Sequence, residues 1–239
     1  MTVPAPVDEP PGDLTTRLRR SFQASVGSIV FGMEDGTVSI FGLVFGVAAS
    51  APDSHAVLLA GATGAVAAAV SMMAGAFLDA ESANDQQAAQ VRALQRRLEH
   101  DSDAADASAR ARLLAEGYEE DEADTVLRLV GRHPESRLRI EAAIELGITD
   151  STRQRPVAQA LWMFAADLVA AAVPVVPFAL FGLATARVVS VVITTLLLVA
   201  LGVGRAAIGG RRLVATVLET LGIAAGAALA GYVIGSLIT

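Results

Sequence analysis

Two adjacent acidic residues, Glu34 and Asp35, lie within a run of apolar and small residues at positions 28–50. As a helix rising about 1.5 Å per residue, this run is long enough to cross a lipid bilayer. A carboxylate inside hydrocarbon is unfavourable unless it is protonated, paired or facing a polar cavity, so such a group is suited to binding cations or protons. The alternative is a solvated kink near the membrane surface, which Gly32 and Gly36 would favour.

Asp35 shares one face of the expected helix with small residues. Ser39, Gly42 and Gly46 follow it at i+4, i+7 and i+11. Small side chains let a second helix approach closely, and the spacing therefore predicts a helix–helix contact that contains an acid.

A second candidate group is Met72, Ala76 and Asp79, which lie at i, i+4 and i+7. A carboxylate oxygen together with a thioether sulfur suits ferrous iron or manganese better than magnesium. The alternative is that Met72 and Met73 fill gaps in an Ala-rich helix.

Three further acids in apolar runs, Glu34, Asp167 and Glu219, are candidate proton-relay groups. Asp167 and Glu219 fit equally well as partners of Arg at a helix end. The residues alone do not decide whether Glu34 or Asp35 points into a pathway.

The composition indicates what positions these residues. The chain has 239 residues, of which 53% are hydrophobic, and a mean hydropathy of +0.52. Soluble domains rarely reach this value, and here it is concentrated in separate runs. We therefore expect an all-α integral membrane protein with five transmembrane helices, at about 24–49, 57–78, 157–180, 185–203 and 213–238.

Residues 81–155 differ in character, with many charges and apolar residues spaced three or four apart. We expect a small domain of three or four helices inserted between spans 2 and 3, with breaks near residues 101–103, 117–118 and 133–134. Its first helix is expected to continue directly from the second span. The predicted divisions are an N-terminal tail and amphipathic lead-in (1–23), spans 1–2 (24–80), the inserted domain (81–155) and spans 3–5 (156–239).

The distribution of charge predicts the orientation. All basic residues are Arg, and they gather before the first span, in the inserted domain and between the last two spans. Positive loops face the cytosol, which places the N-terminus and the inserted domain inside the cell. The Ala-, Arg- and Gly-rich composition favours a high-GC bacterial gene, so we expect a plasma-membrane location. The net charge of −7 argues against nucleic-acid binding.

The first span contains Val30-Phe31-Gly32-x-x-Asp35-Gly36-x-Val38-x-x-Phe41-Gly42-x-x-x-Gly46, and the second contains Ser71-Met72-x-Ala74-Gly75. These motifs resemble those of the vacuolar iron transporter family. The run 145–148 at the end of the inserted domain, Pro174-x-x-Pro177 in the third span and the Gly-rich fifth span also agree with the family.

The resemblance implies a homodimer in the lipid bilayer, with a cytosolic metal-binding domain in each subunit. It also implies proton-coupled export of ferrous iron, and often manganese, as transported substrate rather than as a tightly bound cofactor. Asp35 and Met72 would line the path at the dimer interface, and the small-residue face around Asp35 fits such an interface.

Two departures from the family pattern affect the predicted metal site. Ala76 stands where the family usually has Glu, and Asp79, one turn later, is a hypothetical substitute. Several Glu positions of the inserted domain are also changed. The acids that remain near ligand positions are Asp85, Glu99, Asp106 and Glu145.

The leading prediction is a proton-coupled exporter of divalent metal with a weakened cytosolic capture site. The alternative is a non-transporting structural or regulatory membrane dimer with a degenerate metal site. An enzyme is not expected, because no nucleophile–base pair or metal-hydrolase spacing is present.

Overall fold

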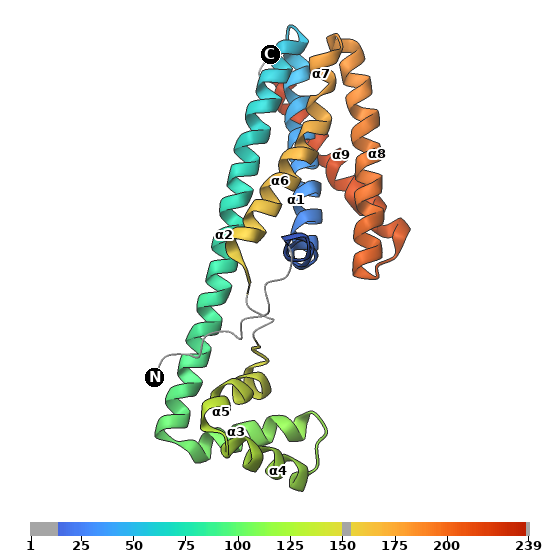
Figure 1. Ribbon diagram of the computed structural model, residues 1–239. Coiled ribbons are helices and arrows are strands. Elements are labelled where there is room, and N and C mark those ends of the chain that lie inside the picture. Colours follow the sequence, from blue (N-terminus) through green and yellow to red (C-terminus); the bar gives the residue numbers. More distant parts are fainter. Residues whose placement is uncertain (1–13, 150–153, 238–239) are drawn as a thin grey trace. The chain divides into compact units, whose positions relative to one another are not determined.

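The computed structural model describes residues 14–149 and 154–237, and no β-strand occurs among them (Figure 1). The chain divides into two compact units, which we describe separately. One, the spanning unit, is Pro11–Leu78 with Pro156–Thr239, and the other, the inserted unit, contains Asp79–Arg155.

Five helices among the described residues are long and apolar enough to cross a membrane, as predicted from the hydropathy. All five contribute to the spanning unit, and α2 continues without a break into the inserted unit. They are α1 (Leu14–Ser50), α2 (Ser54–His100), α6 (Pro156–Val175), α8 (Leu183–Gly209) and α9 (Leu213–Leu237).

The third apolar run is interrupted at its Pro174-x-x-Pro177 motif. Helix α6 ends at Val175, and the short helix α7 (Pro177–Leu180) follows it. Pro177 has no N–H group to continue the helical hydrogen bonds. The hydroxyl of Ser190 on α8 instead donates a 2.8 Å hydrogen bond to the carbonyl oxygen of Pro174, which satisfies a buried acceptor beside the break.

Helix α1 packs closely against α9. A Cβ at Gly42 would lie 3.0 Å from the carbonyl oxygen of Ala227, and one at Gly46 would lie 2.6 Å from that of Gly231. The sequence predicted a close helix contact on this face of α1, and the structure identifies α9 of the same chain as the partner. The interpretation of this face as part of a dimer interface is therefore wrong for Gly42 and Gly46, because α9 already covers them.

Helix α1 also packs against α6. A Cβ at Gly32 would lie 2.6 Å from the sulfur of Met163, and one at Gly36 would lie 2.8 Å from the carbonyl oxygen of Asp167. Since Gly32 meets residue 163 and Gly36 meets residue 167, α1 and α6 run parallel. These two glycines thus allow α6 to approach α1 closely, and they place Asp167 against α1 at Gly36.

Arginines mark one end of the spanning unit. Arg205 lies near the end of α8, Arg211 and Arg212 lie in the turn between α8 and α9, and Arg205 contacts Glu34 near the middle of α1. At the other end, Arg187 donates a hydrogen bond to the carbonyl oxygen of Ala48 near the end of α1. Of these four arginines, three therefore lie towards one end of the spanning unit.

In the inserted unit, α2 is followed by α3 (Ser102–Ala115), α4 (Glu120–Gly131), α5 (Pro134–Glu141) and a π-helical turn, η1 (Ala142–Leu146). Asp101 caps α3 by accepting a 3.0 Å hydrogen bond from the backbone N–H of Ala104. Gly147, with φ of 66°, ends the π-helical turn in a left-handed conformation.

The α1–α9 contact predicts different effects for two glycine substitutions. Gly46→Ala should destabilise the spanning unit by about 1–3 kcal/mol, because the new methyl group would meet backbone atoms of α9. Gly226→Ala on α9 is the matched control, since a Cβ there meets nothing within 4 Å. Unfolding in detergent can be followed by the fluorescence of Trp162, the single tryptophan. Equal stability of the two variants would contradict the packing.

Candidate functional site

A groove of about 550 Å³ lies between α1, α8 and α9 in the spanning unit. Its walls are mostly apolar, with Phe31 and Ile208 among them, and its charged residues are two acids and two arginines. These four are Glu34, Asp35, Arg205 and Arg211. The groove is therefore an apolar surface with a small number of ionisable groups, which is the usual character of a binding site for a small ligand or ion.

Asp35 is the unpaired acid of the groove. Its side chain is half-buried, and no hydrogen bond or ion pair engages it among the described residues. The adjacent Gly36 lies against Asp167 of α6, and the carboxylates of Asp35 and Asp167 are close enough to interact electrostatically. An acid of α1 that lines the groove and a buried acid of α6 outside its lining thus influence each other electrostatically.

Asp167 is fully buried, and neither of its carboxylate oxygens has a hydrogen-bond partner. A charged carboxylate in such surroundings is strongly unfavourable, so this group is suited to carrying a proton. The sequence left open whether Asp167 pairs with Arg. Among the described residues no Arg contacts it, whereas Asp35 lies close by.

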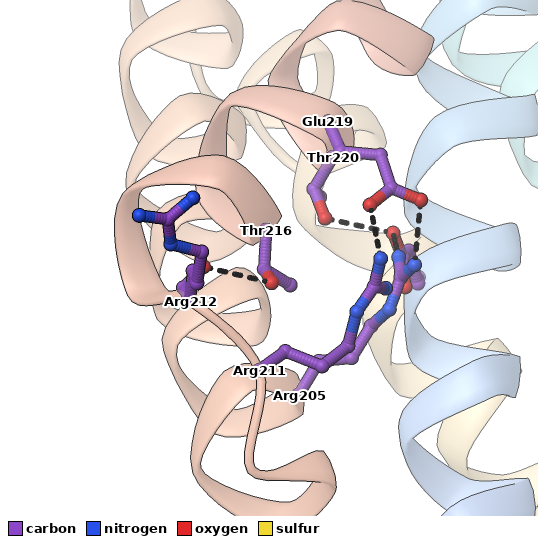
Figure 2. A network of polar contacts seen from close by, with 7 residues as sticks. Arg205, Arg211, Arg212, Thr216, Glu219 and Thr220 are labelled. Atoms are coloured by element: carbon purple, nitrogen blue, oxygen red, sulfur yellow. Dashed lines mark hydrogen bonds and ion pairs between the residues drawn. The ribbon is translucent and has the colours of Figure 1, made fainter.

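Glu34 and Glu219 are paired with arginine (Figure 2). Arg205 Nη1 lies 2.7 Å from Glu34 Oε1, and Arg205 Nη2 lies 2.9 Å from Glu219 Oε1. Arg211 Nη2 contacts the other oxygen of Glu219 at 2.9 Å, and the hydroxyl of Thr220 donates to Glu34 at 2.9 Å. For Glu219, the arrangement corresponds to the predicted alternative of an acid paired with Arg at a helix end.

The two candidates on α2 do not share this groove. Met72 is half-buried, and Asp79 is exposed where α2 passes from one unit to the other. Ala76, one turn before Asp79, is buried. Neither Met72 nor Asp79 lines the groove that contains Asp35.

In the inserted unit, two of the acids predicted as metal ligands are paired with arginine instead. Asp106 Oδ1 lies 2.6 Å from Arg137 Nη2, and Glu145 Oε1 lies 2.6 Å from Arg97 Nη1. Arg137 also contacts Glu141 at 2.5 Å. In each pair the positive charge beside the carboxylate therefore comes from an arginine of the chain and not from a metal ion.

Glu141 is the residue of this cluster that the sequence analysis missed. Its side chain is 1% exposed, and its Oε2 atom has no hydrogen-bond partner. The spacing of Arg137 and Glu141, four residues apart on a helix, is the signal that could have revealed the pair.

Burial by itself lowers the pKa of Arg137, but the hydrogen bonds and charges of Glu141 and Asp106 outweigh it and raise that pKa above its ordinary value. A group with a raised pKa loses its contribution to stability only as the pH rises through that pKa. Arginine is already protonated throughout the ordinary pH range, so this guanidinium keeps its charge there.

The remaining predicted ligands of the inserted unit, Asp85 and Glu99, are exposed on α2. Glu99 accepts a 2.9 Å hydrogen bond from Gln95. Within residues 14–149 and 154–237, no three Asp, Glu or His side chains come together in an arrangement that could hold a metal ion. The structure thus brings Asp35 and Asp167 together, but it does not assemble the predicted metal ligands into one cluster.

Five helices long and apolar enough to cross a membrane define a polytopic membrane protein. Comparison with known proteins gives the family. The model of the VIT family matches residues 26–236, and the chain belongs to this family.

Similar proteins include plant transporters. The chain is 29% identical over 212 residues to a vacuolar iron transporter of Centaurea cyanus, covering 87% of this chain and 85% of that protein. It is 28% identical over 217 residues to vacuolar iron transporter 1 of Arabidopsis thaliana, covering 89% and 86%. It is 26% identical over 208 residues to vacuolar iron transporter 1 of Oryza sativa subsp. japonica, covering 87% and 82%.

The Arg137 cluster predicts a local loss of stability. Arg137→Gln should weaken the inserted unit by about 3–5 kcal/mol, because it leaves the charge of Glu141 buried without a partner. Amide hydrogen exchange of α3 and α5 would show the loss as faster exchange.

Arg112→Gln is the matched control, because its ion pair with Glu116 is exposed and worth about 0–1 kcal/mol. The double variant Arg137→Gln/Glu141→Gln should recover much of the protection lost in Arg137→Gln. Unchanged exchange in Arg137→Gln would show that the cluster does not stabilise the unit.

Proposed function

We propose that this protein is a proton-coupled transporter that exports a divalent metal, ferrous iron or manganese, from the cytosol. The observation that carries the proposal is Asp35, an unpaired carboxylate in a mostly apolar groove, with the buried Asp167 beside it. Membership of the VIT family, and the iron transport named for its plant relatives, support the choice of cargo.

In this proposal Asp35 binds the partly dehydrated metal ion while it is ionised, and releases it on protonation from the far side. Asp167 carries the coupled proton. Two carboxylates that interact electrostatically do not ionise independently, so a cation arriving at Asp35 favours the loss of a proton from the pair. A proton arriving at the pair favours release of the metal.

The groove also supports a dimer. Asp35 and the exposed Phe31 line an open groove on the surface of the spanning unit. An ionisable side chain in a membrane-spanning segment is expected to face protein or a water-filled cavity rather than lipid. We propose that a second copy of the chain covers the groove and encloses the path.

For the membrane orientation, we retain the proposal that the arginine-rich end of the spanning unit faces the cytosol, here of a bacterial plasma membrane. The inserted unit then lies in the cytosol, as a weak capture surface for the metal. Asp85 and Glu99 are the acids available for that role, because Asp106 and Glu145 are paired with arginine. Met72 and Asp79 are proposed as further contacts along α2.

The decisive experiment measures uptake of Fe²⁺ and of Mn²⁺ into proteoliposomes under an imposed pH gradient. We expect wild-type flux that depends on the gradient, and flux at the level of protein-free liposomes for Asp35→Ala and for the isosteric Asp35→Asn. The exposed residue Glu81 provides the control variant Glu81→Gln, which lies outside the groove.

A second candidate function is a non-transporting structural or regulatory dimer, and the arginine-paired acids of the inserted unit favour it. Absence of flux in the wild-type protein, with the dimer intact, would select this function. Flux that persists in Asp35→Ala would instead show that transport uses another path.

If Asp167 carries the coupled proton, its substitution should abolish the coupling of metal flux to the pH gradient without abolishing metal binding. Asp167→Asn removes the buried acid and keeps its shape, so Mn²⁺ should still bind while the dependence of flux on the pH gradient is lost. Binding can be measured by titration calorimetry in detergent and coupling in the same proteoliposomes. A gradient dependence equal to that of wild type would exclude Asp167 as the proton carrier.

A further inference from the structure

The groove contains two adjacent acids of α1, but their surroundings differ. Glu34 is 13% exposed, and its Oε1 atom accepts hydrogen bonds from both Arg205 and Thr220. Asp35 makes no hydrogen bond or ion pair among the described residues. Because both carboxylates line one groove, some feature of the fold must determine which of them meets an incoming cation.

Arg205 is that feature. It lies on α8 with its guanidinium between two carboxylates, Glu34 of α1 at 2.7 Å and Glu219 of α9 at 2.9 Å. Figure 2 shows the side chains of Arg205 and Arg211 lying side by side and directed at Glu219. The side chain of Arg205 is 27% exposed, and its guanidinium contacts acids on two helices, α1 and α9, which hold it beside Glu34.

The formal charges show the consequence. Arg205 balances Glu34, and Arg211 balances Glu219. With Glu219 included, the cluster around the groove has three acids and two arginines, and the charge left without a partner is that of Asp35. A divalent cation bound by one carboxylate is released more readily than one held between two adjacent carboxylates, because the attraction grows with the number of negative charges.

We propose that Arg205 is a positioning residue that withdraws Glu34 from cation binding and leaves Asp35 as the free carboxylate of the groove. This inference rests on the proposed function for its physiological meaning, but its test does not require transport. In transport terms, Arg205 keeps metal affinity low enough for turnover. The residue acts through Glu34 and does not itself contact the metal.

The test measures Mn²⁺ binding to the full-length protein in detergent by titration calorimetry, together with KM and kcat for Mn²⁺ flux. In Arg205→Gln, Glu34 becomes available beside Asp35. We expect Mn²⁺ to bind about tenfold more tightly, which corresponds to about 1.4 kcal/mol. KM and kcat should both fall, because a more tightly held ion leaves more slowly.

The double variant Glu34→Gln/Arg205→Gln supplies the rescue. If Arg205 acts through Glu34, this variant should return the Mn²⁺ affinity to within about threefold of wild type, or about 0.65 kcal/mol. Arg112→Gln is the matched control, since it removes the same charge from an exposed ion pair with Glu116 outside the groove and leaves the Glu34–Arg205 pair in place. Its affinity should change much less than that of Arg205→Gln.

Each outcome decides for or against the inference. An affinity in the double variant that stays as far from wild type as in Arg205→Gln would show that Arg205 acts only as a structural contact. If Arg205→Gln does not fold, the double variant decides alone, because loss of both charges leaves no unpaired ion. A Mn²⁺ affinity of the double variant that is tenfold weaker than that of wild type would identify Glu34 as a metal ligand and overturn the inference. Absence of flux in wild type would count against the proposed function and leave the binding result valid.

Discussion

The close approach of α1 to its neighbours is the constraint on which the spanning unit depends. At these contacts α1 has glycine, which has no side chain to separate it from α6 and α9. Backbone atoms of the facing helices therefore lie where a Cβ atom would otherwise be. Gly36 brings Asp167 beside Asp35, and Gly46 fixes α9 against α1. The site therefore depends on residues that have no side chain of their own.

Arginine determines the state of the acids that this packing brings together. Glu34 and Glu219 form ion pairs with guanidinium groups, whereas Asp35 and Asp167 form none among the described residues. The same division occurs in the inserted unit, where Asp106 and Glu145 are paired and Asp85 is exposed. In both units, therefore, arginine neutralises some of the acids and leaves others without a counter-charge.

The sequence predicted the spanning helices well, because hydropathy and length depend only on local composition. It also predicted a close contact on the Gly42–Gly46 face of α1. It did not identify the partner, since small residues favour a contact within one chain as much as a contact between two chains. The inserted unit shows a similar limit. Glu141 acquires its importance from burial, and the contact of Arg137 with Asp106 depends on the position of α3, which local spacing does not give.

Arg137 has an evolutionary consequence. A guanidinium between Asp106 and Glu141 supplies permanently the positive charge that a metal ion would supply only when it is bound. A substitution that restored another acid nearby would gain little affinity for metal while this arginine remains. Loss of the arginine first would leave Glu141 buried without a counter-charge. A route to a metal site at this position would therefore pass through a less stable intermediate, so such a site is difficult to reach one mutation at a time.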